Sequence, residues 1–98
     1  MQIALSSAPV RNKDIPHNLA AMTAALAQAA ADGADLVVFG ESTLQGFDCL
    51  CWSYAADRDM ALPLDSAPIR QLRDAAQKYA TAISFGFIER DGDALYSS

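Results

Sequence analysis

Residues 35–42 read DLVVFGES, and this short segment limits the possible folds of the chain more than any other. Four apolar residues in a row, two β-branched and one aromatic, lie between a break at Gly33 and a second glycine, Gly40. A run of this length and composition suits a strand that is buried on both faces. Such strands occur in parallel sheets covered by helices, so the segment predicts an α/β fold.

Glu41 follows the predicted strand 36–39 at its carboxyl end. Open α/β sheets bind their ligands in the crevice outside the carboxyl ends of the strands. We therefore expect Glu41 to be half-buried in such a crevice, where a carboxylate can serve as a general base. The alternative is a solvated acid at a strand end, which is the ordinary environment of an acidic residue next to a loop.

Along the whole chain, the spacing of apolar residues alternates between a strand-like and a helix-like pattern. The predicted order is strand, helix, strand, loop, helix, strand, hairpin. Strands are expected at residues 3–5, 36–39 and 82–88. The pair Asp91-Gly92 predicts a tight turn into a last strand at residues 94–96. This order of elements is typical of an α/β domain.

Both helices have recognisable starts. Asn12 and Asp14 can cap a first helix that has Pro16 in its first turn, and Gly33 can end that helix as a left-handed cap. The second helix is expected to begin near Ser66. Its apolar residues recur at helical spacing and its charged residues lie on the other side, so we interpret it as scaffold.

A long connection, residues 42–65, joins the second strand to the second helix. Connections in compact α/β units usually have about 2–6 residues, and longer ones often carry function. This connection holds Phe47, Trp52 and Tyr54, close in sequence to Glu41. We consider them candidates for the wall of a substrate pocket, with packing in a satellite core as the alternative.

The chain has two cysteines, Cys49 and Cys51, and one histidine, His17. Cysteines one residue apart do not readily bridge each other, so both should be reduced thiols. Neither is expected to be a nucleophile, because a reactive thiolate needs a base or a cation beside it. His17 has no second imidazole or cysteine at metal-binding spacing, so we expect a capping or surface role and no metal site.

Composition excludes several classes of partner. No apolar run approaches the ~20 residues that a membrane helix needs, and the basic residues near the amino terminus follow the apolar stretch, which is the reverse of a secretory signal. The net charge is -5, and the seven Lys and Arg are scattered rather than clustered. We therefore expect a cytoplasmic protein with no membrane and no nucleic acid as partner.

Residues 34–47, ADLVVFGESTLQGF, resemble the opening catalytic segment of the nitrilase superfamily, the carbon–nitrogen hydrolases. Residues 1–10 resemble the first strand of that family, residues 18–31 its first helix, and residues 83–98 its third strand and following hairpin. The resemblance implies the amino-terminal part of a four-layer α-β-β-α sandwich. We expect residues 1–98 to be the amino-terminal portion of one such domain, truncated after the hairpin.

The resemblance also implies a chemistry. Glu41 would be the general base of a Glu-Lys-Cys triad that hydrolyses amides, carbamoyl compounds or nitriles. The other two members lie downstream in the family, and neither Lys13 nor Lys78 matches the catalytic lysine. We expect a homo-oligomer that acts on a small molecule without a metal or organic cofactor.

Two other classes of function were considered. One is a nucleotide-binding or phospho-receiver module, which is disfavoured because neither of the phosphate-binding glycine patterns is present. The other is a catalytically incomplete chain that serves only in interaction or assembly. The absence of matching lysine and cysteine positions from residues 1–98 makes this the main alternative.

Overall fold

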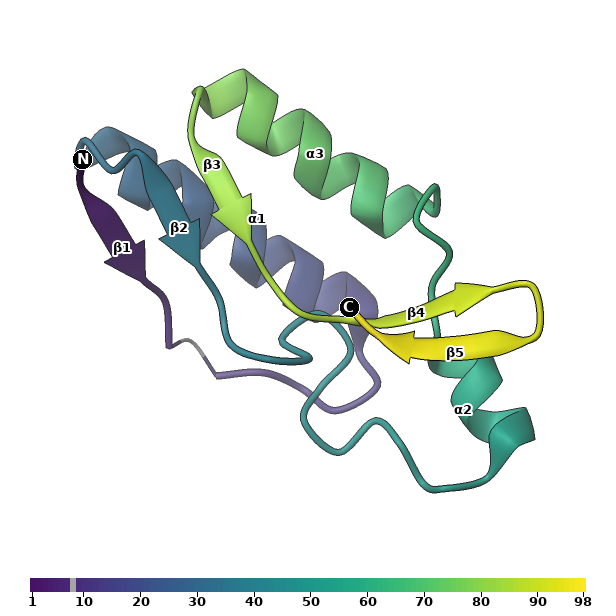
Figure 1. Cartoon of the computed structure of the whole chain (residues 1–98). Helices are drawn as coiled ribbons and strands as arrows, with labels where there is room; N and C mark the ends of the chain where they lie inside the picture. Colours follow the sequence, from purple (N-terminus) through teal and green to yellow (C-terminus); the bar gives the residue numbers. More distant parts are fainter. Residues whose placement is uncertain (8) are drawn as a thin grey trace.

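The computed structural model describes residues 1–7 and 9–98. Strands and helices alternate along the chain (Figure 1). In chain order the elements are β1 (Ile3–Leu5), α1 (Ile15–Ala31), β2 (Leu36–Val38), α2 (Tyr54–Met60), α3 (Ala67–Tyr79), β3 (Ala82–Ser84), β4 (Ile88–Asp91) and β5 (Ala94–Ser97).

The first three strands form a parallel sheet in the order β1-β2-β3. Ile3 pairs with Leu36, and Leu36 pairs with Ala82. Each connection between these strands contains at least one helix, as a parallel sheet requires. The chain is therefore α/β, and the fold class predicted from the sequence is confirmed.

Local signals place the ends of α1 where the sequence predicted them. The carboxylate of Asp14 caps the helix by accepting a hydrogen bond from the backbone N–H of His17 at 3.1 Å. Pro16 lies in the first turn. Gly33 follows the helix at φ +86°, in the left-handed region that ends many helices.

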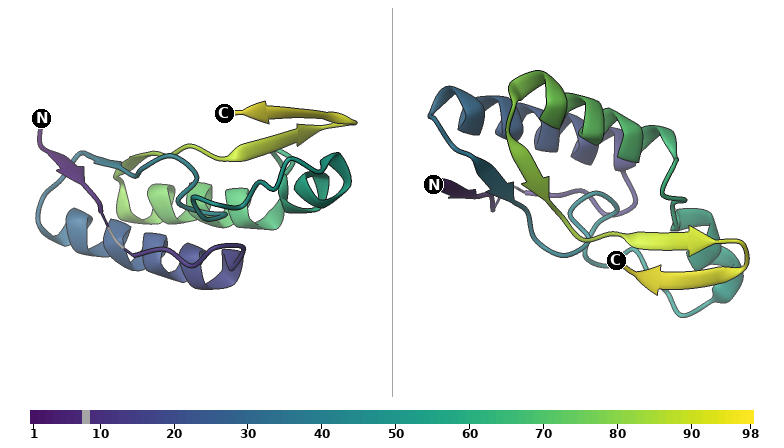
Figure 2. Two further views of the ribbon diagram at one scale, coloured as in Figure 1. Left: turned by 90° about the horizontal axis from the view of Figure 1, so that it is seen from below. Right: turned by 45° about the horizontal axis from the view of Figure 1, so that its top comes forward.

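Helices α1 and α3 cover the same face of the sheet (Figure 2). The core lies between them and the strands, and it includes Met22 and Leu26 of α1, Val37 of β2 and Leu72 of α3. Each of these four side chains is buried. The second predicted helix is thus the scaffold that its apolar stripe indicated, with Ser66 at its N-cap.

The opposite face of the sheet is apolar and open. Ile3 and Leu5 point to that face and are 55% and 81% exposed. In the register they lie beside Leu36 and Val38, which are partly exposed. Successive residues of a strand point to opposite faces, so one face of this sheet is covered by helices and the other presents aliphatic side chains to solvent.

The hairpin of β4 and β5 forms a second, separate sheet. The outer edge of β4 is covered by Leu62, whose N–H donates to the carbonyl of Ile88 at 2.9 Å. A small second core of Cys49, Ala61 and Ile88 joins this hairpin to the preceding loop and to the residue after α2. Figure 1 shows α2 and the hairpin together beyond the carboxyl ends of the parallel strands.

The expected third strand, residues 82–88, is wrong in its extent. The parallel strand β3 ends at Ser84, and a new strand begins at Ile88 in the second sheet. Between them the chain changes partners, since the backbone N–H and carbonyl of Phe87 both pair with Ser98. The hairpin itself is confirmed, although its two-residue loop is Gly92-Asp93 rather than Asp91-Gly92.

The expectation that residues 42–65 form a continuous loop is also wrong, because this connection contains α2. The helix has no apolar stripe that a periodic pattern could reveal. It is held at its start by Asp57, whose carboxylate accepts a hydrogen bond from the N–H of Cys51 at 2.8 Å. A carboxylate in the first turn also interacts favourably with the helix dipole.

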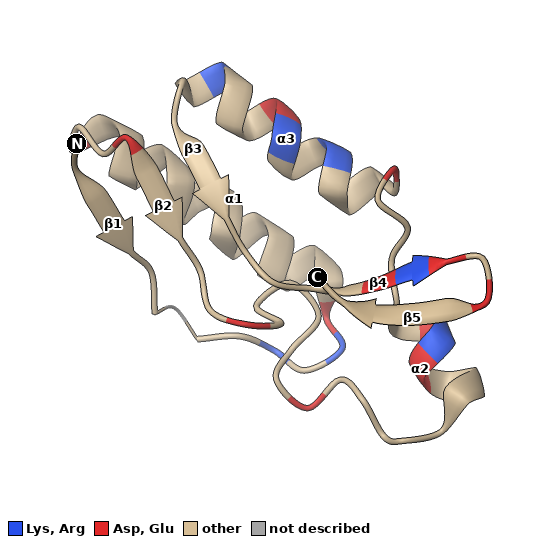
Figure 3. Ribbon diagram, in the orientation of Figure 1, with Lys and Arg blue, Asp and Glu red and all other residues tan. Residues whose placement is uncertain are grey.

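Charged residues are distributed over several loops, α2, α3 and the hairpin (Figure 3). The seven basic residues lie on the loop before α1, on α2, on α3 and on β4. None of the helices in the described part of the chain is both long enough and apolar enough to span a bilayer.

Candidate functional site

Glu41 lies just beyond the carboxyl end of β2. The chain continues past the strand in sheet-like register, because the N–H of Phe39 donates to the carbonyl of Ser84 at 2.8 Å. Phe39 is buried in the core and Gly40 is exposed. Glu41 therefore follows the last buried position of the central strand of the sheet, at the edge where open α/β sheets bind ligands.

The expectation that Glu41 is half-buried is wrong, because Glu41 is exposed. Ser42 lies at φ +54°, a left-handed conformation that turns the chain immediately after Glu41 and leaves the glutamate on the outside. Within residues 1–7 and 9–98, its carboxylate makes no hydrogen bond and no ion pair. The carboxylate is therefore free to accept a proton from a bound group.

The turn that carries Glu41 is buried and closely bonded. The N–H of Gly46 donates to the carbonyl of Ser42 at 2.7 Å, and the hydroxyl of Thr43 donates to the carbonyl of Gly40 at 2.8 Å. Residues 42–46 are all buried. A non-glycine residue in the left-handed region costs about 1–3 kcal/mol and persists only when its surroundings hold it there. These bonds are part of that support for Ser42.

Two buried carboxamides that the sequence analysis did not single out hold this turn. Gln45 is 0% exposed and bonds to the backbone of Met60 and Ile88. Asn18, 1% exposed, donates from Nδ2 to the carbonyl of Leu44 at 3.0 Å. No sequence pattern marks either residue, because their partners lie 15 to 43 positions away for Gln45 and up to 26 for Asn18.

Glu41 shares a cleft of about 390 Å³ with two of the three predicted wall residues, Phe47 and Trp52. Both aromatic side chains are largely exposed. The remaining lining residues are Ser42, Asp48, Cys49, Leu50 and Ile88.

Tyr54, the third predicted wall residue, lines a neighbouring cleft of about 360 Å³. The two clefts share Leu50, Trp52 and Ile88. The hydroxyl of Tyr54 donates to the carbonyl of Asp93 at 2.6 Å, which ties α2 to the hairpin loop. Tyr54 is thus next to the cleft of Glu41 rather than inside it.

The two cysteines have different environments. Cys49 is 1% exposed, and burial is the main cause that raises the pKa of its thiol above the ordinary value of 9.0, with the carboxylates of Asp57 and Asp48 adding to the effect. Its thiol is therefore protonated at neutral pH. Cys51 is exposed, and its Sγ donates to Oδ1 of Asp57 at 3.4 Å.

The remaining polar residues that the sequence analysis considered are peripheral. Lys13 and Lys78 are exposed, and Nζ of Lys78 lies 5.3 Å from the centre of the Tyr79 ring. His17 lies in the first turn of α1, where its backbone N–H is capped. Within the described residues no three His, Cys, Asp or Glu side chains gather closely enough to hold a metal ion.

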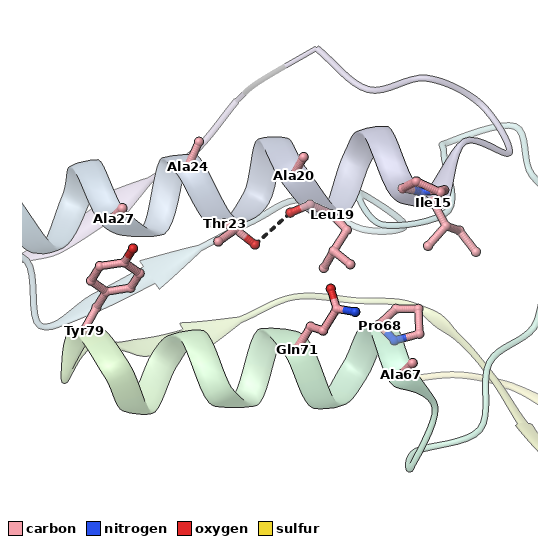
Figure 4. Close-up of a pocket in the computed structure, with 11 residues that line it drawn as sticks. Ile15, Leu19, Ala20, Thr23, Ala24, Ala27, Ala67, Pro68, Gln71 and Tyr79 are labelled. Atoms are coloured by element: carbon pink, nitrogen blue, oxygen red, sulfur yellow. Dashed lines mark hydrogen bonds between the residues drawn. The ribbon is translucent and has the colours of Figure 1, made fainter.

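A larger groove of about 680 Å³ lies between α1 and α3 (Figure 4). It is lined mainly by alanines and other apolar side chains, with Thr23, Gln71 and Tyr79 as polar members. The groove offers an apolar surface but no carboxylate, thiol or imidazole. Neither Glu41 nor any of the three predicted wall residues lines it.

Residues 2–98 match the family model described as carbon-nitrogen hydrolase. The chain belongs to the carbon–nitrogen hydrolase family. The strand order and the covering helices agree with the amino-terminal part of the α-β-β-α fold of this family, which the resemblance of residues 34–47 implied.

Three curated relatives illustrate the similarity. An arylacetonitrilase of Hypocrea virens is 32% identical over 80 residues, which are 74% of this chain and 24% of the relative. An arylacetone-specific nitrilase of Alcaligenes faecalis is 35% identical over 78 residues, 70% of this chain and 22% of the relative. A bromoxynil-specific nitrilase of Klebsiella pneumoniae subsp. ozaenae is 35% identical over 82 residues, 74% of this chain and 24% of the relative. The chain spans about a quarter of the length of these carbon–nitrogen hydrolases.

Proposed function

We propose that this chain supplies the general base of a hydrolase that cleaves carbon–nitrogen bonds in small nitriles, amides or carbamoyl compounds. Glu41 is that base in the proposal. The observation that carries it is the place of the Glu41 carboxylate: at the carboxyl edge of a parallel sheet, exposed, and in a cleft with Phe47 and Trp52. The family match over residues 2–98 supports the reaction class.

The proposed reaction proceeds through a covalent intermediate. The Glu41 carboxylate takes the proton of a cysteine thiol, and the thiolate sulfur forms a bond to the electrophilic carbon of the substrate. A lysine ammonium stabilises the negative charge that develops on the substrate heteroatom. The protonated Glu41 gives its proton to the substrate nitrogen, and the carbon–nitrogen bond breaks to release ammonia or an amine and leave a thioester; a nitrile first takes up one water at the carbon. A further water, deprotonated by the same carboxylate, attacks the thioester carbon, the carbon–sulfur bond breaks to release the carboxylic acid, and the proton returns to the sulfur. No step needs a metal or organic cofactor.

Cys49 and Cys51 are not the nucleophile in this proposal. The buried Cys49 thiol has a raised pKa and stays protonated at neutral pH. Cys51 has a carboxylate beside its sulfur rather than a cation or an imidazole. In this proposal neither the nucleophile nor the lysine is among residues 1–98, which by themselves should show no turnover.

We further propose that Phe47, Trp52 and Tyr54 contact the substrate. Aromatic side chains offer a large apolar surface, and the first two share the cleft with Glu41. Two of the relatives are arylacetonitrilases, so nitriles that carry an aryl ring are the first compounds to test.

The decisive experiment uses the protein as its gene encodes it. A screen of aryl and alkyl nitriles, short amides and carbamoyl amines is followed by steady-state kinetics of Glu41→Gln. Glutamine keeps the size of the side chain but cannot accept the proton, so kcat should fall by about 10²- to 10⁴-fold. The melting temperature should stay within a degree or so, because Glu41 is exposed and unpaired in the described chain.

Asp48→Asn provides the matched control, because Asp48 is a second exposed carboxylate in the same cleft. This variant, like Cys51→Ser, should keep most of the turnover. A dead Asp48→Asn or Cys51→Ser beside a fully active Glu41→Gln would move the chemistry to the loop of residues 47–54 and would refute the proposed role of Glu41.

A second candidate function is assembly with another polypeptide without catalysis. The open face of the parallel sheet favours it, since Ile3 and Leu5 present aliphatic surface to solvent. Formation of a homo-oligomer in the cytoplasm is a related proposal, and it is compatible with catalysis. A protein that binds a partner but hydrolyses no compound of the screen would support assembly alone.

A further inference from the structure

The side chain of Gln45, close to Glu41 in the chain, makes three hydrogen bonds to backbone groups. Its Nε2 donates to the carbonyls of Met60 at 2.6 Å and Ile88 at 3.1 Å, and its Oε1 accepts from the N–H of Ile88 at 2.7 Å. The residue is 0% exposed. One buried amide thus joins the turn after β2 to the end of α2 and to the first residue of β4.

The same turn is held from its other side by residues that precede and begin α1. The N–H of Lys13 donates to the carbonyl of Gln45 at 2.8 Å, and Asn18 donates to the carbonyl of Leu44 at 3.0 Å. The backbone of the turn is therefore fixed against α1, and the Gln45 side chain bonds the turn to the first residue of the hairpin.

Residues 86–88, which include the hydrogen-bond partner of Gln45, also lie against Glu41. A Cβ built on Gly86 would lie 3.4 Å from the Cα of Glu41 and 3.7 Å from the N of Ser42, so the two backbones are in close contact. Ile88, two residues further, bonds to Gln45 and lines the cleft of Glu41. A shift between the turn and residues 86–88 would thus move the Glu41 carboxylate relative to its own cleft.

We propose that Gln45 is a positioning residue for Glu41. This inference rests on the proposed function of Glu41 as general base. Proton transfer requires the base within hydrogen-bond reach of the donor, and small misplacements of reacting groups lower rates steeply. Gln45 does not line the cleft, so it touches no substrate and acts only by fixing where Glu41 lies.

The test must separate positioning from stability. Gln45→Met keeps the side-chain volume but removes all three hydrogen bonds. Thr81→Val is the matched control, because Thr81 is buried to a similar degree and its hydroxyl donates to the carbonyl of Tyr79 at 3.1 Å. Thr81 precedes β3, at the opposite end of the strands from Glu41. Both variants should lower the melting temperature.

Kinetics are measured on the protein as its gene encodes it, with the best substrate of the screen, well below both melting temperatures. Gln45→Met should lower kcat by about 10- to 100-fold with KM within about twofold, whereas Thr81→Val should leave both constants near the wild-type values. A wild-type kcat for Gln45→Met, or an equal loss of kcat for Thr81→Val, would overturn the inference.

Hydrogen exchange of residues 40–47 gives a readout that does not depend on catalysis. Exchange there should be faster in Gln45→Met than in the wild type and unchanged in Thr81→Val. If the wild type hydrolyses none of the compounds, the proposed function fails. The hydrogen-exchange rates then still test whether Gln45 holds the turn. Unchanged exchange in Gln45→Met would overturn the positioning role whatever the activity.

Discussion

Gly46 occupies a position that only glycine fits. It has φ +101°, and a Cβ there would lie 2.5 Å from the Cα of Asn12. Because the obstacle is backbone, we expect Gly46→Ala to lower the free energy of unfolding by about 2–4 kcal/mol. Gly92 also has a positive φ, of +61°, but has open space around it. Gly92→Ala should cost only about 1 kcal/mol, and equal losses in urea unfolding would contradict the steric argument.

Cys49 should make stability depend on pH in alkaline solution. Burial raises the pKa of its thiol above 9.0, so the folded chain holds this proton to a higher pH than the unfolded chain does. The resulting stabilisation is complete below the unfolded pKa and is lost as the pH rises through the folded pKa. Above pH 9 the free energy of unfolding should therefore decline more steeply in the wild type than in Cys49→Ala.

Urea unfolding at a series of pH values measures this difference. Cys51→Ala is the control, because that thiol is exposed, and its pH dependence should follow that of the wild type. The remaining titratable groups are common to all three proteins. If the free energy of unfolding declined equally with pH in the wild type and in Cys49→Ala, the buried thiol would contribute nothing to the pH dependence of stability.

The candidate site was only partly accessible from the sequence. The place of Glu41 at the end of a strand followed from the apolar run before it, which is local information. Its exposure did not, because that depends on the left-handed conformation of Ser42. The role of Gln45 in holding the Glu41 turn could not be predicted either, because its partners Met60 and Ile88 become neighbours only when the chain folds.

At the scale of elements, local chemistry explains which predictions were confirmed. Strands β1 and β2, helices α1 and α3, and the hairpin each carry their own signal in the sequence. For α1 these signals are the Asp14 cap, Pro16 and Gly33. Each of them acts within a few residues, so a single sequence is enough to read it.

The two elements that were predicted wrongly are set by tertiary contacts. Helix α2 lacks an apolar stripe, and Tyr54 at its start bonds to the carbonyl of Asp93 in the hairpin loop, 39 residues away. The end of β3 at Ser84 reflects the close approach of Gly86 to Glu41 and the pairing of Phe87 with Ser98. Such contacts do not change the spacing of apolar residues in the sequence. Residues 82–88 are therefore predicted as one strand.

At the scale of the whole molecule, the open aliphatic face of the parallel sheet should govern behaviour in solution. We expect the 98-residue chain to self-associate at micromolar concentration, because exposed apolar patches on a sheet promote association. Leu5→Glu, which places a charge on this face, should shift the chain toward monomer. Size-exclusion chromatography with light scattering measures the change.

Leu64→Glu is the control for that experiment. Leu64 is also an exposed leucine, but it lies in the connection between α2 and α3 rather than on the sheet. Its substitution should leave association unchanged. A wild-type chain that elutes as a monomer throughout the concentration range would contradict the prediction.

The contrast between the buried turn and its exposed neighbours has a consequence for how such a protein can diversify. Gln45 and Asn18 fix the Glu41 turn from inside, whereas Phe47 and Trp52 lie largely outside the core. Side chains with little burial can be exchanged at small cost to stability. The chain thus keeps the groups that hold the Glu41 turn in its core and the proposed substrate contacts on its surface, so substitutions of Phe47 and Trp52 can change which substrate binds at little cost to the stability of the fold.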